Sequence, residues 1–133
     1  EGTLFAQYSA VASGIRTINA LDDGTVNESI RLRTNTTNPL FTVTDGGVDQ
    51  SDIDAGTVAS NIVYKFAGAY AANNFAASIS GGAAVTDTSG TLPTVDRAML
   101  GNSAAGNYLN GHIRQIVYYP RRLSNAELQG LTS

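Results

Sequence analysis

Two groups of tyrosine, amide and basic side chains are the residues of this sequence best suited to hold a sugar. A sugar is both ring-flat and polar, so its sites combine an aromatic face with side chains that bind hydroxyl groups. The sequence has six tyrosines and no tryptophan, so tyrosine must supply that face. The predicted ligand-binding residues are Tyr70, Asn73, Asn74, Tyr108, Asn110, His112 and Arg114. The competing interpretations are core burial for each tyrosine and a polar strand-edge residue for His112.

The densest acidic cluster predicts a candidate metal site at Asp45, Asp49 and Asp52. Closely spaced carboxylates beside glycines suit Ca²⁺, which prefers oxygen ligands. No calcium loop of recognised spacing is present, and an exposed acidic loop explains the same residues without an ion. We therefore expect no required cofactor, with calcium as the metal that this stretch would take.

The three glutamates do not form the carboxylate pair that glycoside hydrolysis needs. Glu1 is terminal, Glu28 opens a predicted strand, and Glu127 belongs to a helix cap, so none of them is a natural general acid. A serine nucleophile would need His112, the single histidine, but no Gly-x-Ser-x-Gly elbow accompanies it. We expect a protein that is not an enzyme.

Alternating apolar and polar residues predict the strands that position these groups. In the closing strand, Ile113 and Val117 are expected to share one face. Asn73-Asn74 predicts a hairpin turn, because asparagine tolerates the left-handed conformation. The acidic stretch is expected to be an exposed loop. The predicted strands cover residues 3–11, 15–21, 28–34, 41–43, two runs within 61–80, 97–101 and 112–119.

A capping box, with Ser124 at the cap and Glu127 three residues later, predicts one short C-terminal helix. Nine or ten short strands followed by a single helix are typical of an all-β protein. The fold we expect is a two-sheet antiparallel jelly-roll sandwich with one short C-terminal helix. Residues 1–133 should form this single domain, which we expect to be excised from a larger protein.

Composition and charge exclude several kinds of partner. The net charge of −3 is spread without a basic block that could neutralise phosphates, so nucleic acid is not an expected partner. No window approaches the roughly 20 apolar residues of a membrane span, so membrane insertion is not expected either. The absence of cysteine excludes disulfides and thiolate metal sites.

Two stretches resemble a known family. Residues 108–131, which include Tyr-Tyr-Pro-Arg-Arg-Leu-Ser-Asn-Ala-Glu-Leu, look like the closing strand and helix of concanavalin A-like, laminin-G-type jelly rolls. The sequence of this stretch is especially similar to modules of bacteriophage tail and structural proteins. Residues 66–70 and 75–81 resemble a further strand pair of that family, whose tyrosine, here Tyr70, lies on the core side. Arg114 and Ser80 replace acidic residues common in the family, which argues against its calcium binding.

The resemblance implies a recognition role but does not settle function by itself. Our leading hypothesis is a non-catalytic, carbohydrate-binding module of a phage virion or tail-associated protein, located on the virion or outside the cell. Its partners would be a glycan or host-surface polysaccharide and other virion subunits. The alternatives are a structural domain that forms homo-oligomers in a viral assembly without binding sugar, and an accessory module of a polysaccharide-degrading enzyme.

Overall fold

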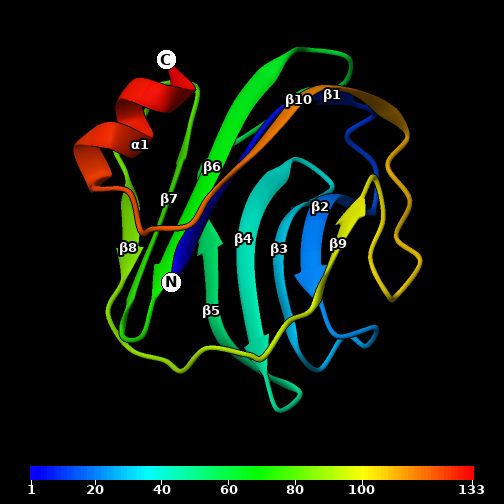
Figure 1. Cartoon of the computed structure of the whole chain (residues 1–133). Helices are drawn as coiled ribbons and strands as arrows, with labels where there is room; N and C mark the ends of the chain where they lie inside the picture. The colour runs from blue at the N-terminus through cyan, green and yellow to red at the C-terminus, as the bar shows by residue number, and fades with distance from the viewer.

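Two five-stranded antiparallel sheets pack face to face, and the computed structural model describes all residues 1–133 (Figure 1). We call them sheet A and sheet B. Sheet A has the strand order β10 (Gly111–Tyr119), β1 (Gly2–Ala10), β6 (Tyr64–Ala71), β7 (Asn74–Ile79) and β8 (Val85–Asp87). Sheet B has the order β5 (Val48–Asp54), β4 (Asn38–Asp45), β3 (Ser29–Asn35), β2 (Ile15–Asp22) and β9 (Arg97–Leu100).

The strands of the two sheets are stacked so that β1 lies over β2, β6 over β3, and β7 and β8 over β5. The segment between β8 and β9 crosses from one sheet to the other past the ends of β5 and β4 (Figure 1). The predicted two-sheet sandwich is therefore confirmed. The Asn73-Asn74 hairpin is confirmed as well, because Asn73 has a positive φ of 55° between β6 and β7.

Aromatic side chains from both sheets fill the space between them. Phe41 of sheet B and Phe66 and Phe75 of sheet A are fully buried, together with aliphatic residues from most strands. Gly68 lies directly opposite the ring of Phe41: a Cβ at position 68 would come within 2.2 Å of Phe41 Cδ2. The close approach of the sheets at this point therefore requires glycine.

The helix α1 (Asn125–Thr132) packs on the outer face of sheet A, beside β6 and β7 (Figure 1). Its capping box is formed as predicted: Ser124 Oγ accepts from the Glu127 backbone N–H, and the Glu127 side chain accepts from the Ser124 N–H. Small residues of the strands let the helix approach closely. The buried cluster beneath it contains Phe5, Ala67, Ala69, Ala76, Leu123 and Leu128. No helix of the structure is long and apolar enough to span a bilayer.

Two local predictions were wrong. The acidic stretch expected as a loop contains the edge strand β5, because Ile53 packs into the core while the aspartates of β5 point away from it. In β10, Arg114 is an extra residue at a bulge opposite Gln7 and Tyr8. The bulge reverses the alternation, so Ile116 packs on the core and Val117 packs on the outer, helix-covered side.

Candidate functional site

The first predicted sugar-binding group, around Tyr70, is not an open site. Tyr70 is 5% exposed and packs in the core, and burial followed by a hydrogen bond with Tyr118 raises its pKa. Asn73 uses its backbone N–H and its side-chain Oδ1 to hold Gly90, at 2.9 and 3.1 Å. Asn74 begins β7 as an exposed residue. The Tyr70 ring is therefore unavailable for stacking on a ligand, since β6 directs it between the sheets.

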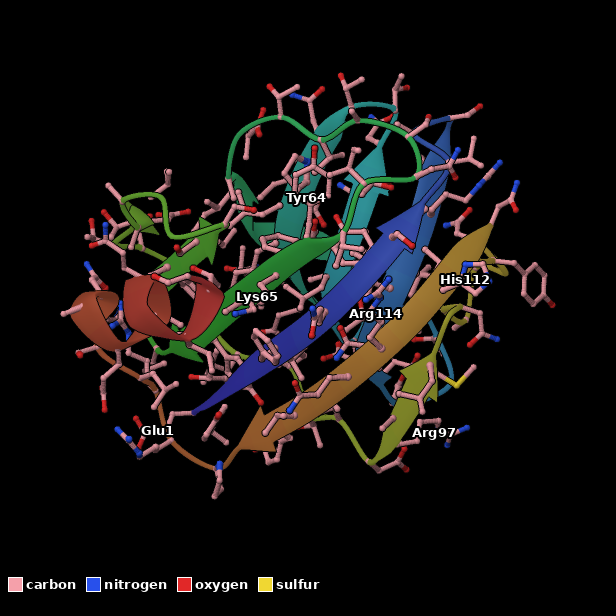
Figure 2. The ribbon with its side chains drawn as sticks, turned by 90° about the horizontal axis from the view of Figure 1, so that it is seen from above. Glu1, Tyr64, Lys65, Arg97, His112 and Arg114 are labelled. Atoms are coloured by element: carbon pink, nitrogen blue, oxygen red, sulfur yellow. The ribbon has the colours of Figure 1, made fainter.

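The second predicted group stays together and is exposed. Tyr108 is 69% exposed, and Asn110, His112 and Arg114 are exposed beside it in the chain. The loop that carries Tyr108 is anchored by backbone hydrogen bonds from Leu109 N to Gly101 O and from Val11 N to Asn110 O. Figure 2 shows His112 and Arg114 along β10, away from the helix.

The two predicted groups lie at opposite ends of sheet A. Tyr70 is opposite Gly2 at the beginning of β1, whereas Gly111, which follows Asn110, is opposite Ala10 at the end of β1. The structure therefore does not join the two groups into one site. It leaves the second group exposed and buries the tyrosine of the first.

The three aspartates predicted to hold a metal are directed to other partners. Thr91 Oγ1 donates to Asp45, Thr44 Oγ1 donates to Asp49 at 2.7 Å, and Thr42 Oγ1 donates to Asp52 at 2.6 Å. The chain contains no group of three or more histidine, cysteine or acidic side chains arranged to hold a metal ion. The predicted calcium site is thus not assembled by this geometry.

The outer face of sheet B carries a polar array whose two central arginines, Arg31 and Arg33, were not among the predicted binding residues. Arg31 and Arg33 project from the central strand β3, because Ile30 and Leu32 between them point into the core. Ala20 on one side and Thr42 on the other lie opposite Arg31 in the register. The residues that share this outer face, strand by strand from β5 to β9, are Asp49, Asp52, Asp54, Leu40, Thr42, Thr44, Ser29, Arg31, Arg33, Thr17, Ala20, Asp22, Arg97 and Met99.

Hydrogen bonds tie both guanidinium groups to threonines of the neighbouring strand β4. Arg33 donates from Nε to Thr42 Oγ1 at 2.7 Å and from Nη2 to Asp52 Oδ1 at 3.1 Å. Thr42 Oγ1 in turn donates to Asp52 at 2.6 Å. Arg31 donates from Nη2 to Thr44 Oγ1 at 3.0 Å, with Asp49 Oδ1 at 4.0 Å. Because two hydrogen bonds fix Arg33 and one hydrogen bond fixes Arg31, the array is ordered before any ligand arrives.

Part of the hydrogen-bonding capacity of this face is unused. Thr17 Oγ1, Asp22 Oδ2 and Arg31 Nε are buried polar atoms of the face without a hydrogen-bond partner. Burial lowers the pKa of Arg31, and the neighbouring positive charge of Arg33 lowers it further. Buried polar groups in folded proteins are usually paired, so unpaired ones call for a functional or solvent partner.

The glutamates have local structural contacts. Glu28 Oε1 accepts from the Gly46 N–H at 2.8 Å, which ties two turns of sheet B together. Glu127 accepts from the Ser124 N–H at 2.7 Å and pairs with Arg121. These two carboxylates belong to different parts of the fold, one beside a turn of sheet B and the other on the helix over sheet A.

One signal in the sequence pointed to the arginine face. Within the predicted strand 28–34, the alternation Ile30-Arg31-Leu32-Arg33 predicts that both arginines point outward, but exposed arginine is ordinary on a strand surface. What makes the pair unusual is its place on the central strand and its low exposure, 13% for each side chain. Both features depend on the order of the strands in the sheet, and the alternation of residues within one strand gives no information about that order.

No protein-family model matches the sequence, and no curated protein is detectably related to it. Solved structures do match its fold. The CBM40 module of the Ruminococcus gnavus IT-sialidase, bound to α2,3-sialyllactose, is similar with a TM-score of 0.81 and 20% identity over 99% of this chain and 82% of that chain.

Two whole sialidases match through part of their length. The leech intramolecular trans-sialidase has a TM-score of 0.80 and 18% identity, and the NanB sialidase of Streptococcus pneumoniae has 0.79 and 13%. The match covers 98% and 99% of this chain but 23% and 24% of those chains, so the chain spans about a quarter of their length. At such identities the likeness defines the fold, and the predicted jelly roll is confirmed. Fold and site together define a jelly-roll domain with one polar sheet face that no helix covers.

Proposed function

We propose that this chain is a non-catalytic carbohydrate-binding module that holds a glycan on the outer face of sheet B, centred on Arg31 and Arg33. The observation that carries the proposal is this arginine pair, fixed on the central strand of an open polar face. The similar module of the R. gnavus sialidase, bound to α2,3- and α2,6-sialyllactose, supports it by analogy of fold.

The side chains of this face match the chemistry of sugar hydroxyl groups. A hydroxyl both donates and accepts, whereas a guanidinium only donates and a carboxylate only accepts. Arg33 and Asp52, 3.1 Å apart, therefore offer both functions within reach of two neighbouring hydroxyls. Hydrogen bonds to charged groups are roughly twice as strong as neutral ones, so a few of them give useful affinity.

The loop that carries Tyr108 borders this face at the Arg33 end. Thr17 lies opposite Arg33 in the register, and its N–H donates to Asn107 O in that loop at 2.9 Å. We propose that Tyr108 stacks on a sugar ring next to the arginines, with Asn110 as a hydrogen-bonding neighbour. In this proposal, the predicted group around Tyr108 contributes to the rim of the site on sheet B.

We also propose a virion or extracellular setting, in which the module of a phage tail-associated protein contacts a host-surface polysaccharide. The similarity of residues 108–131 to the closing strand and helix of phage structural modules supports this setting. Other virion subunits would then be its second kind of partner.

A binding experiment with three arginine variants tests the proposed site. Oligosaccharides, both uncharged and sialylated, are titrated into the 133-residue chain while binding is followed by isothermal calorimetry and NMR. Arg33→Ala removes charge-assisted hydrogen bonds worth about 1.5–3 kcal/mol, so the affinity should fall about 10- to 100-fold.

Two other arginines serve as comparisons. Arg121, which pairs with Glu127 beside the helix, is the matched control, and Arg121→Ala should leave glycan affinity within twofold of the parent. Arg114→Ala tests the competing surface on β10. If Arg114→Ala abolishes binding and Arg33→Ala does not, the site lies on sheet A and our placement is wrong. Absence of glycan binding by the parent chain at millimolar ligand would refute the proposed function itself.

A further inference from the structure

On the outer face of sheet B, the aspartates of the edge strand β5 are far more exposed than the central arginines Arg31 and Arg33 that they accompany. The side chain of Asp49 is 53% exposed and that of Asp52 is 42% exposed, against 13% for Arg31 and for Arg33. A ligand that approaches this face therefore meets carboxylate oxygens before it meets guanidinium groups. Carboxylates accept hydrogen bonds and donate none, so they require a ligand that donates.

The positive charge of the arginine pair is already matched within the face. Asp52 contacts Arg33 at 3.1 Å, and Asp49 lies 4.0 Å from Arg31. Arg97, at the other edge, pairs with Asp96 at 2.9 Å. Across the whole face three arginines stand with four aspartates, namely Arg31, Arg33 and Arg97 with Asp22, Asp49, Asp52 and Asp54.

The surroundings add to this negative balance. The chain as a whole carries a net charge of −3. Asp54, on the same edge strand, accepts from Asn38 Nδ2 at 2.6 Å with one oxygen and from Gly56 N with the other, so no arginine pairs with its charge. An anionic ligand would have to approach the exposed aspartates of β5 or displace one from its arginine. Both routes weaken the binding of an anion, because the first brings it close to negative charges and the second breaks an ion pair. A site with unpaired arginines would have neither penalty.

We infer, resting on the proposed function, that this face selects an uncharged, hydroxyl-rich sugar chain and disfavours acidic sugars such as sialylated or uronic-acid glycans. The hydroxyl groups donate to Asp49 and Asp52 and accept from the remaining N–H groups of Arg31 and Arg33. The chain would thus share the fold of the sialyllactose-bound module but differ from it in the charge of its ligand.

The test compares uncharged with acidic oligosaccharides of similar size. Lactose, maltotriose, cellotriose and mannotriose form the uncharged arm, and 3′-sialyllactose and trigalacturonic acid form the acidic arm. Calorimetry at 20 and 500 mM NaCl gives the affinities. We expect at least one uncharged probe to bind tenfold or more tightly than either acidic probe, with less than a twofold change between the two salt concentrations, because no net charge is neutralised.

Substitution of one exposed carboxylate sharpens the test. Asp52→Asn keeps the size of the side chain but removes its charge, so it should weaken the uncharged ligand at least fivefold and strengthen binding of 3′-sialyllactose. Asp87→Asn, on β8 of sheet A, makes the same change in net charge and should alter neither affinity more than twofold. Thermal melts confirm that both variants are folded.

The outcomes separate this inference from the proposed function. Tighter binding of an acidic probe, weakened by salt and lost in Arg33→Ala, would overturn the preference for uncharged sugars and leave the carbohydrate-binding site in place. Equal effects of Asp52→Asn and Asp87→Asn on uncharged sugars would also overturn it, since the carboxylate would then act through overall charge. If no probe binds in either arm, both proposals fail.

Discussion

The outer faces of the two sheets differ in what covers them. On sheet A, alanines and Phe5 lie beneath α1, where they pack against Leu128 of the helix and Leu123 just before it. On sheet B, the corresponding face is lined by arginine, aspartate and threonine, and the helix does not pack on it. A sandwich needs one buried layer between its sheets, so each outer face is free to take another role. Here the helix covers the β6 and β7 part of one outer face, whereas no helix covers the other.

The contrast extends to individual polar groups. On sheet A, the buried Thr3 hydroxyl accepts from Leu123 N at 3.0 Å and donates to Arg121 O at 2.9 Å, so both of its functions hold the chain that leads into the helix. On sheet B, the buried Thr17 hydroxyl has no partner. The Thr3 hydroxyl is thus paired on the face that carries the helix, whereas the Thr17 hydroxyl is unpaired on the face where we place the ligand.

The largest effect is expected from truncation of the helix contact on sheet A. Leu128 is fully buried, so Leu128→Ala should lower the free energy of unfolding by about 2–5 kcal/mol through lost burial and a cavity. Leu100, 64% exposed, is the matched control, and Leu100→Ala should change stability by no more than about 0.5 kcal/mol. Urea denaturation measures both. Similar losses in the two variants would show that α1 does not stabilise sheet A.

A smaller effect is expected when the polar link to the helix is cut. Thr3→Val keeps the shape of the side chain but leaves the Leu123 N–H buried without its acceptor, which should cost about 1–3 kcal/mol. Thr17→Val makes the same substitution on sheet B, where no partner is lost, and should be close to neutral. A reversed order of the two losses, measured by the same denaturation, would contradict the division of roles between the faces.

Substitutions in the arginine pair should affect stability less than either change on sheet A. Arg33→Ala removes an ion pair with an exposed carboxylate, so unfolding free energy should fall by up to about 1 kcal/mol. The Thr42 hydroxyl keeps its bond to Asp52, which limits the loss. A drop as large as that of Leu128→Ala would mean that the pair is structural, and the case for a ligand site there would lose its basis.

The smallest expected effect is a pH dependence at the helix cap. The Arg121 side chain, followed by the Ser124 N–H, lowers the pKa of Glu127 to about 2 from its ordinary 4.5. A carboxyl group whose pKa is lowered by folding stabilises the fold at every pH above its pKa in the unfolded chain. This contribution is lost as the pH falls from about 4.5 toward 2. Because Glu127 is exposed, salt should reduce the effect. Glu127→Gln should flatten this part of the stability profile, measured by urea melts from pH 2 to 6, and an unchanged profile would remove Glu127 as its source.

Local sequence signals were sufficient for much of the architecture. Alternation located most strands, Asn73 marked the β6–β7 turn by its tolerance of positive φ, and the Ser124/Glu127 box marked the start of the helix. Each of these signals lies within a few residues of the feature it predicts. The failures share the opposite property: the edge strand β5 is stabilised by cross-strand partners on β4, and the bulge at Arg114 exists only relative to β1.

The sequence by itself determined that Arg31 and Arg33 face away from the core, because Ile30 and Leu32 must be buried and a strand alternates its side chains. Tertiary structure alone decided that β3 is the central strand, that no helix covers it, and that Asp49 and Asp52 reach the arginines from β5. It also decided which tyrosine is usable, since Tyr70 faces the opposite sheet while Tyr108 lies on an anchored loop. The physical reason is that the side of the sheet to which a side chain points is fixed by its position within its own strand. Its neighbours across the sheet, in contrast, come from distant parts of the chain.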